Sequence, residues 1–251
     1  MLDKRIRRAL FDLANKVHCQ QCSSTSLSIV EDARKTKPLS IPSTSRVNVM
    51  VLWRRYLFSV VTPWQKIDDD FWDQLMAQPL WKQLMAESYN RSPSVAQLRN
   101  MMKACGSRSP AKKAHAIHEA LRKDLSFWTS MSAAVNRALK TGNERAFELE
   151  AVAAVSALKG CGVGPKVARL MLIYPDRPGC RPLCQNIVPI DQRWINYLTG
   201  YGCDLSGYNL KSKKMYLQLE DKIVAAAAEA GLTGVEADRL VFSGVQAFLA
   251  A

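Results

Sequence analysis

The sequence predicts an all-α protein, and three observations support this expectation. Apolar residues recur at the three- and four-residue steps of amphipathic helices in most segments from Val47 onward. No two alternating segments joined by a hairpin turn stand out, and no internal repeat is visible. Hydrophobic residues make up 48% of the 251 positions, which is enough to bury one large domain core or two lobes that share one.

The predicted helices follow one another along the chain. Residues 47–61 are apolar enough for a buried helix, although their β-branched side chains also permit a strand. The other helices from Val47 onward are expected over residues 67–87, 95–106, 110–128, 143–160, 165–174, 192–202, 210–231 and 234–250. Ser94 can cap the helix that follows it, Gly106 can end that helix, and Pro110 suits the first position of the next one.

The N-terminal segment is expected to precede the main domain. Residues 2–17 alternate charged and apolar groups at helical spacing, which predicts a short amphipathic helix. Residues 19–46 are rich in Ser, Thr and Pro, so we interpret residues 1–46 as this helix and a linker. No apolar run approaches the ~20 residues of a membrane span, and the first segment lacks the apolar stretch of a signal peptide. We therefore expect an intracellular protein that has no membrane partner.

The charge balance favours a polyanionic partner. Lys and Arg number 35 against 22 Asp and Glu, which gives a formal net charge of +13. Each phosphate that a basic side chain neutralises releases condensed counterions, so a surplus of this size is typical of proteins that bind nucleic acid. A basic protein that is merely soluble is the alternative interpretation.

The seven cysteines are expected to be reduced thiols. Cys19 and Cys22 form a C-x-x-C, and three residues separate Cys180 from Cys184. A zinc or iron–sulfur site usually takes four ligands from two such pairs, but these pairs lie far apart in the sequence. We expect no metal site, and whether either pair binds anything stays open.

The segment GCGVGPKVARL joins two of the predicted helices. Gly160, Gly162 and Gly164 alternate here, although the whole chain has only 12 glycines. Glycine adopts positive φ and lacks a Cβ, so this turn can bring two helices close together. The helix that begins at Pro165 presents backbone N–H groups without intrahelical partners, and these can bind an anion. A plain turn between packed helices and a phosphate site both fit the pattern.

Lys166 stands in the first turn of the helix that follows the glycines. The helix dipole disfavours a cation there by about 0.3–1 kcal/mol. The positive charge of Arg169, three positions further along, also disfavours a protonated lysine. Both effects, together with partial burial, would push the amine toward the neutral form that a nucleophile needs. An exposed lysine that tolerates a small penalty is the alternative.

Asp191 comes directly before another predicted helix, in the segment VPIDQRW. Aspartate is among the best N-cap residues, so its role can be structural. It can also be a carboxylate fixed at a helix start for chemistry. The sequence between Lys166 and Asp191 allows one helix and a return loop, which can bring the two side chains together.

The hairpin GVGPKVA and the downstream VPIDQRW together resemble the helix-hairpin-helix DNA glycosylase superfamily, of the endonuclease III and oxoguanine glycosylase type. Members carry a hairpin of the form L-P-G-V-G-x-K-x-A and then V-P-V-D-x-H at the start of a later helix. Lys166 falls on the family's catalytic lysine, and Asp191 falls on its catalytic aspartate. The likeness covers roughly residues 47–250, and only these two motifs are specific.

The resemblance implies an architecture and a set of site residues. It implies one glycosylase domain over residues 47–250, made of two helical lobes with a DNA-binding cleft between them. Residues 47–60 and 205–250 would form one lobe, and residues 61–204 the other. Lys166 and Asp191 would be catalytic, and the DNA-binding residues would be Gly160, Gly162, Gly164, Arg169 and Arg193.

Three features depart from the family pattern. The hairpin reads LKGCGVGPK, about two residues longer than usual. The Pro- and Cys-containing loop over residues 175–188 lengthens the segment between Lys166 and Asp191. Arg193 stands where many members have a histidine, and a guanidinium group there still suits a phosphate contact.

The resemblance also implies the ligands. The partner would be double-stranded DNA that contains a damaged or modified base, and the protein would act as a monomer. No cofactor is expected, apart from a monovalent cation that the hairpin could hold. The four-cysteine cluster of some members is absent, so we expect no iron–sulfur cluster. Trp64, Gln65 and Arg54 are candidates for a base-flipping wedge, although core packing or exposure is the commoner role.

The implied activity is base excision. The enzyme would flip the base out, Lys166 would attack the anomeric carbon to form a Schiff base, and β-elimination would nick the strand. Oxidised guanine is the first substrate to consider, followed by oxidised pyrimidines and by a bulky modified base of foreign or phage DNA. The alternatives are a monofunctional glycosylase that uses water and Asp191, and a non-catalytic DNA-binding module.

Overall fold

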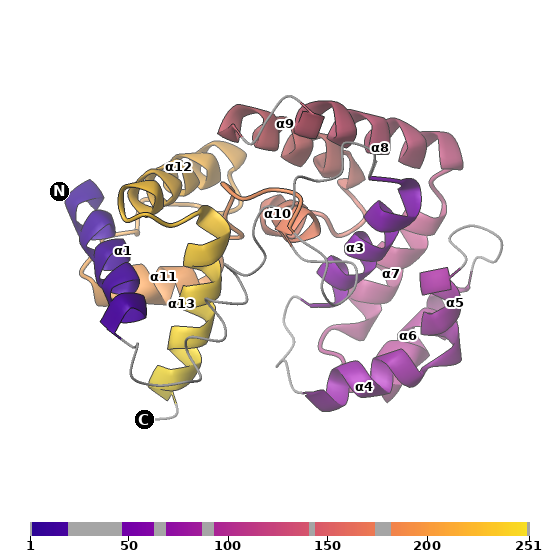
Figure 1. The fold of residues 1–251 in the computed structure, drawn as a ribbon. Coiled ribbons are helices and arrows are strands. Elements are labelled where there is room, and N and C mark those ends of the chain that lie inside the picture. Colours follow the sequence, from indigo (N-terminus) through magenta and orange to yellow (C-terminus); the bar gives the residue numbers. More distant parts are fainter. Residues whose placement is uncertain are drawn as a thin grey trace. The chain divides into compact units, whose positions relative to one another are not determined.

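The fold is entirely helical in the part of the chain that the computed structural model describes, as the sequence predicts (Figure 1). The described residues are 2–19, 47–62, 69–86, 93–140, 144–173 and 182–249. The helices are α1 (Leu2–Cys19), α3 (Val49–Val61), α4 (Asp69–Ala77), α5 (Pro79–Ala86), α6 (Val95–Ala104), α7 (Pro110–Leu121), α8 (Leu125–Lys140), α9 (Arg145–Val155), the 3-10 turn η2 (Ser156–Leu158), α10 (Pro165–Ile173), α11 (Gln192–Gly200), α12 (Lys213–Glu229) and α13 (Gly234–Leu249).

The chain divides into two compact units. Unit 1 comprises Met1–Ser45, Asn143–Glu148 and Arg181–Ala251, and unit 2 comprises Arg46–Gly142 and Leu149–Cys180. These units group the segments differently from the predicted lobes. Helix α3 packs against α7, α8 and α10 within unit 2, whereas residues 205–250 belong to unit 1. Helix α1 packs against α11, α12 and α13, so it is an integral part of unit 1.

Unit 2 is built around the apolar helix α3. The rings of Trp53 and Tyr56 stack with centroids 5.6 Å apart, and Trp128 of α8 meets Trp53 edge-on at 5.4 Å. The indole N–H of Trp53 donates to the carbonyl of Leu84 at 2.6 Å, so this buried polar group has a partner. The segment over residues 47–61, for which a strand was the alternative, is therefore a buried helix.

Unit 1 has its core between α1, α11, α12 and α13. Ile6 and Leu10 of α1 are fully buried there, together with Trp194 of α11 and Ile223 of α12. The indole N–H of Trp194 donates to a carboxylate oxygen of Asp238 at 2.8 Å, which ties α11 to α13.

Local sequence signals explain several helix ends. Ser94 and Gln97 form a reciprocal capping box at the start of α6, and Gly106 after its end has a φ of +67°. Pro110 begins α7, as expected. Asp191 is the N-cap of α11.

Two predicted helices are each divided in two. Residues 67–87 were expected to form one helix, but Pro79 begins a separate helix, α5, since proline disfavours helical backbone in the residue before it. The helix expected over residues 110–128 ends at Leu121, and α8 begins after Asp124. The side chain of Asp124 accepts the backbone N–H of Phe127 at 2.8 Å, which stabilises this new helix start.

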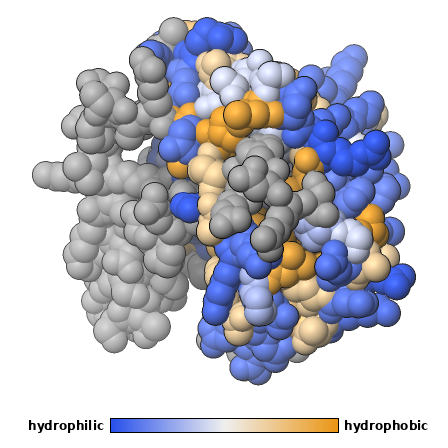
Figure 2. Space-filling model, turned by 90° about the vertical axis from the view of Figure 1, so that its right-hand side faces the viewer, coloured by the Kyte–Doolittle hydropathy of each residue, from blue (hydrophilic) through white to orange (hydrophobic). Residues whose placement is uncertain are grey.

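No helix in the described residues is long and apolar enough to cross a membrane. Figure 2 shows one face of the protein, on which hydrophilic side chains predominate and hydrophobic ones gather in small separate areas. Large hydrophobic side chains that are exposed in the described residues are Phe11, Met76, Leu125 and Met215.

Candidate functional site

The hairpin, residues 160–164, joins η2 to α10 within unit 2. Gly160 and Gly162 have φ values of +94° and +76°, which L side chains rarely adopt. Cys161 and Val163 are only 2% and 6% exposed, whereas the three glycines are exposed. The alternation anchors the turn through its two apolar side chains and leaves the glycine backbone at the surface.

The three glycines have different surroundings. A Cβ on Gly162 would lie 2.9 Å from the Cβ of Ala116 in α7, closer than real Cβ contacts. A Cβ on Gly160 or Gly164 would meet nothing within 4 Å. Gly162 therefore fits the interpretation of a tightly packed turn, and Gly160 and Gly164 leave open space beside the backbone, as a phosphate site requires.

Tyr56 ties the hairpin to the core of unit 2. Its hydroxyl lies 2.7 Å from the carbonyl oxygen of Ala116 and 3.0 Å from that of Cys161. Tyr56 is fully buried, and burial raises its pKa well above the ordinary value, so the hydroxyl keeps its proton as a donor. The hairpin is thus held by packing, by this neutral hydroxyl group and by a backbone hydrogen bond from the N–H of Cys161 to the carbonyl of Leu158 at 2.9 Å.

Lys166 occupies the second position of α10 and is half-buried. The helix begins as the sequence predicts, with Pro165 first and the carbonyl of Gly164 accepting the N–H of Ala168 at 3.0 Å. Arg169 is 5% exposed, and its Nη1 donates to the carbonyl of Pro165 at 3.0 Å. Arg169 therefore supports the first turn of α10, and its contact with DNA stays a prediction.

Asp191 caps α11 through a backbone that is extended at φ −136° and ψ −170°. Its Oδ1 accepts the backbone N–H of Arg193 at 3.0 Å. Its Oδ2 accepts Nε and Nη2 of the same arginine at 2.9 Å and 2.5 Å. The guanidinium carbon also lies 4.3 Å from the ring centroid of Phe242 in α13. Arg193, predicted as a phosphate contact, here holds the carboxylate of Asp191.

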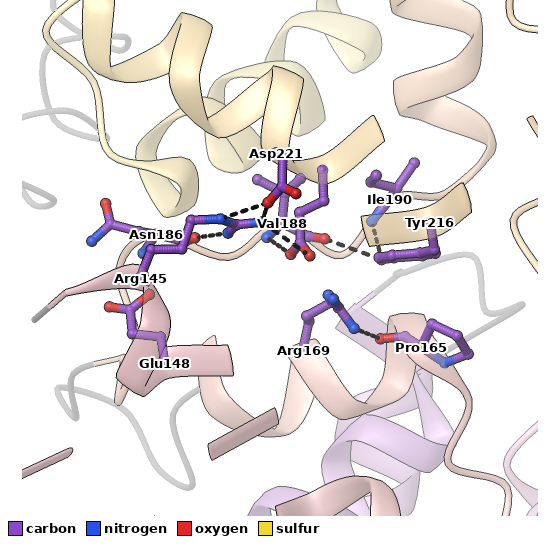
Figure 3. Close-up of polar contacts among 10 residues, drawn as sticks. Arg145, Glu148, Pro165, Arg169, Asn186, Val188, Ile190, Tyr216 and Asp221 are labelled. Carbon is purple, nitrogen blue, oxygen red and sulfur yellow. Dashed lines mark hydrogen bonds and ion pairs between the residues drawn. The ribbon is translucent and has the colours of Figure 1, made fainter. Parts of the chain in front are cut away.

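The chain reaches Asp191 through a segment that is neither helix nor strand, residues 185–190, which we call the strap. No strand pairs with the strap in the described residues, yet Ile187, Val188 and Ile190 are buried. Buried backbone N–H and C=O groups need hydrogen-bond partners. Side chains of α9 and α12 provide most of them within unit 1 (Figure 3). The backbone N–H of Val235 in α13 adds a hydrogen bond to the carbonyl of Gln185 at 3.0 Å.

Glu148 binds the first part of the strap. The side chain is 1% exposed, and its two oxygens accept the N–H groups of Gln185 and Asn186 at 2.7 Å and 2.6 Å. Arg145 donates to the carbonyl of Asn186 from one turn earlier in α9. Burial raises the pKa of Glu148, although the two N–H groups and Arg145 act in the opposite direction.

Tyr216 and Glu220 bind the second part of the strap. Glu220 is fully buried, and its Oε1 accepts the N–H of Val188 at 2.8 Å. The Tyr216 hydroxyl donates to the carbonyl of Val188 at 3.0 Å and accepts the N–H of Ile190 at 2.6 Å. We call Glu148, Tyr216 and Glu220 the clamp.

A cation accompanies the carboxylates of the clamp. Nη2 of Arg145 lies 3.5 Å from Oε2 of Glu220 and 2.5 Å from Oδ1 of Asp221. A buried carboxylate is costly unless it is paired and hydrogen-bonded, and Glu220 has both kinds of partner. The negative charge of Glu220 is therefore compensated by Arg145, and the buried carboxylate can support the strap.

The predicted site residues fall into two groups. Gly160, Gly162, Gly164, Lys166 and Arg169 belong to unit 2, where they form the hairpin and the start of α10. Asp191 and Arg193 belong to unit 1, where they form the start of α11 and contact each other.

The clamp was not predicted, although the sequence contains a signal for it. Glu148 lies on the same helical face as Val152 and Val155, and Glu220 lies on the same face as Ile223 and Val224; all six are buried. A carboxylate at an apolar position of an amphipathic helix indicates a buried partner. The identity of that partner depends on the tertiary fold.

Lys113 is a second residue that was not predicted. It lies in α7, is 4% exposed, and donates from Nζ to the carbonyl of Val61 at 2.6 Å and to Ser107 Oγ at 3.0 Å. Desolvation by burial lowers its pKa to about 8. Its acceptors connect the end of α3 to the turn before α7, so we assign it a structural role.

Other expected features have ordinary surroundings or lie outside the described residues. Trp64, Gln65, Cys22 and Cys180 lie outside them, as does the side chain of Cys19. Arg54 donates from Nε to the carbonyl of Met85 at 2.9 Å, which is a structural contact. Within the described residues, no group of three or more His, Cys, Asp or Glu side chains could hold a metal ion.

Comparisons with models of protein families, with curated proteins and with solved structures find no match for this chain. The resemblance to glycosylases therefore depends on the residues of the hairpin and of VPIDQRW. A fold does not determine a function, so the chemistry of these two sites is what bears on the activity.

Proposed function

We propose that this protein is a DNA glycosylase that excises a damaged or modified base, with Lys166 as its nucleophile. The observation that carries the proposal is the hairpin with Lys166 directly behind it. Two glycines of the hairpin have open space at the Cβ position, and the lysine lies on the second residue of the helix that follows. This combination supports the proposal, because a helix start with open glycine backbone before it suits a phosphate group and the lysine is close to it in sequence.

The hairpin would bind one phosphate of the DNA backbone. Gly160 and Gly164 are exposed, and a Cβ at either position would meet nothing within 4 Å, which leaves space for an anion beside the backbone. The formal charge of +13 adds a sequence-independent attraction to the duplex. Binding should therefore weaken steeply as the salt concentration rises.

The chemistry would proceed by nucleophilic displacement. The neutral amine of Lys166 attacks the anomeric carbon of a flipped nucleotide, and the bond to the base breaks as the base leaves with a proton. The sugar ring then opens to a Schiff base, from which β-elimination cleaves the strand. Asp191 would assist proton removal from the lysine and stabilise positive charge on the sugar.

Trapping the Schiff base tests the nucleophile. Duplexes that each contain a single lesion are incubated with the protein and reduced with borohydride; the panel covers oxidised guanine, oxidised pyrimidines and a bulky modified base. Wild type should become covalently attached to at least one duplex, and Lys166→Gln should not. Lys159→Gln removes one positive charge directly before the hairpin and is the matched control. This variant should still be trapped. Trapping of Lys166→Gln would show that Lys166 is not the nucleophile.

A double-mutant comparison tests whether Lys166 and Asp191 act together. Residues that act as a unit in catalysis have strongly non-additive effects. Lys166→Gln combined with Asp191→Asn should therefore be no slower in base release than the slower single variant. Additive losses in rate would contradict the proposed pairing.

A non-catalytic DNA-binding module is the second candidate. The observation in its favour is that Arg193 engages both carboxylate oxygens of Asp191, as expected for a residue that only caps a helix. This candidate predicts salt-dependent binding to duplex DNA without base release or trapping on any lesion. Asp191→Asn would then lower stability and binding together, whereas the enzyme would keep its affinity and lose turnover.

A further inference from the structure

The strap is an unusual way to bring a chain to a helix start. A turn or a strand would satisfy its backbone with other backbone groups, but here most of the described partners are side chains. Two backbone hydrogen bonds accompany them, from the N–H of Val235 to the carbonyl of Gln185 and from the N–H of Ile190 to the carbonyl of Val188, both at 3.0 Å. Glu148 reaches the strap from 37 positions before it, and Glu220 reaches it from 32 positions after. Two carboxylates are almost fully buried for this purpose, which a fold tolerates only when their hydrogen bonds are complete.

The hydrogen bonds of the clamp are distributed along the strap up to the residue before Asp191. Glu148 binds at Gln185 and Asn186, Glu220 binds at Val188, and Tyr216 binds Ile190, which directly precedes Asp191. Pro189 has no N–H to satisfy and restricts the backbone of Val188 to an extended conformation. Asp191 is therefore fixed by Tyr216 on one side and by the first turn of α11 on the other.

We propose that Tyr216 is a positioning residue for Asp191, with Glu148 and Glu220 as its supports, an inference that rests on the proposed function. Tyr216 touches neither DNA nor the reacting atoms in this scheme. Its hydroxyl fixes the peptide groups on both sides of Pro189 and so sets where the carboxylate of Asp191 lies. A displacement of about 1 Å at a catalytic group can cost ~100-fold in rate, so a hydroxyl at this position has a large effect on turnover.

Tyr216→Phe is the direct test, and Tyr197→Phe is its matched control. Tyr197 also lies in unit 1, and its hydroxyl donates to the carbonyl of Ala9 at 2.7 Å, away from the strap. Each variant loses one hydrogen-bonded phenol hydroxyl and keeps its ring. Single-turnover base release by Tyr216→Phe should fall ~10- to 100-fold with little change in Kd for the duplex, whereas Tyr197→Phe should stay within about threefold of wild type.

Glu148→Gln separates positioning from stability. Glu148 holds two N–H groups at the far end of the strap, so its loss should lower stability more than Tyr216→Phe does. Its effect on the rate should nevertheless be the smaller of the two, because its contacts are further from Asp191. If the rates simply follow the stabilities of the three variants, the clamp is only structural and the inference is wrong.

A readout without activity keeps this test independent of the proposed function. Amide exchange of Val188 and Ile190 should accelerate at least ~10-fold in Tyr216→Phe and not in Tyr197→Phe, because only the first variant opens the strap. Equal exchange in both variants would overturn the clamp itself. If wild type releases no base from any lesion while exchange responds as expected, the proposed function fails and the clamp stands as the determinant of the α11 start.

Discussion

The hairpin and the strap position Lys166 and Asp191, the two predicted catalytic residues, by different physical means. The hairpin has exposed glycines and two buried apolar side chains, and it is supported by the neutral hydroxyl of Tyr56 and by a local backbone hydrogen bond of Cys161. The strap has buried apolar side chains and a backbone that is held by the carboxylates of Glu148 and Glu220. The conformation of the hairpin depends on glycines, which have no Cβ, whereas that of the strap depends on side chains that lie far away in the sequence.

The largest effect on stability is expected at Gly162. Gly162→Ala introduces a Cβ into a residue with φ of +76° and places it 2.9 Å from Ala116 Cβ. The left-handed backbone and the overpacking together should lower the free energy of unfolding by about 3 kcal/mol. Urea denaturation at equilibrium measures this change. A loss below about 1 kcal/mol would mean that α7 can move away from the hairpin, and the two regions would then differ less than described.

The hairpin depends on local sequence and the strap on distant partners, and this difference explains which features could be predicted from the sequence. The helices, the Ser94 cap and the hairpin follow from local rules, so periodicity and the spacing of glycines predicted them. Helix breaks at Pro79 and Asp124 are also local, but the apolar periodicity continues across them and concealed them. The burial of Glu148 and Glu220 could have been predicted from their positions on apolar helix faces, but their partners could not, because these depend on which backbone segment meets each carboxylate after folding. The role of Arg193 depended on the side-chain geometry around Asp191.

Glu148→Gln should give the next largest effect, and it tests the electrostatic support of the strap. A carboxylate accepts both N–H groups, of Gln185 and Asn186, but an amide presents one oxygen and one NH₂ group to them. One buried donor loses its partner, so the free energy of unfolding should fall by about 2 kcal/mol at neutral pH. Urea denaturation measures it, and an unchanged midpoint would show that the strap does not need the charge.

The same variant should reveal the sign of the pKa shift of Glu148. Burial raises this pKa from its ordinary value of 4.5, so the folded state binds a proton before the unfolded state does as the pH falls. Wild type should therefore gain stability relative to Glu148→Gln as the pH falls from neutral toward 4.5, and the gap should stop widening below that value. A gap that narrows on acidification would mean that the hydrogen bonds outweigh desolvation.

Lys113 in unit 2 should give the opposite dependence of stability on pH. Its pKa is lowered from 10.5 to about 8 by burial, so between these values the unfolded state binds more protons than the folded state. Wild type should gain stability relative to Lys113→Met as the pH rises from 7 to 10, by on the order of 1–2 kcal/mol. Denaturation at the two pH values measures the change. No change with pH would mean that solvent reaches the amine of Lys113 and that burial does not lower its pKa.

The smallest effect on stability, and the sharpest test of the hairpin, is expected for Gly164→Ala. Gly164 has no positive φ, and a Cβ there would meet nothing within 4 Å, so the free energy of unfolding should change by less than about 0.5 kcal/mol. If a phosphate group lies against this backbone, the added methyl group should nevertheless weaken duplex binding by ~10-fold, because it occupies the space that the anion needs. Fluorescence anisotropy with an undamaged duplex at low salt measures the affinity.

The matched control is Gly231→Ala, which adds a methyl group at an open glycine of unit 1 with φ of +75°. This variant should lower stability while leaving affinity unchanged. Equal affinities for wild type and Gly164→Ala would indicate that the hairpin is only a packed turn. Both the hairpin and the strap would then have structural roles, although they are built from different residues.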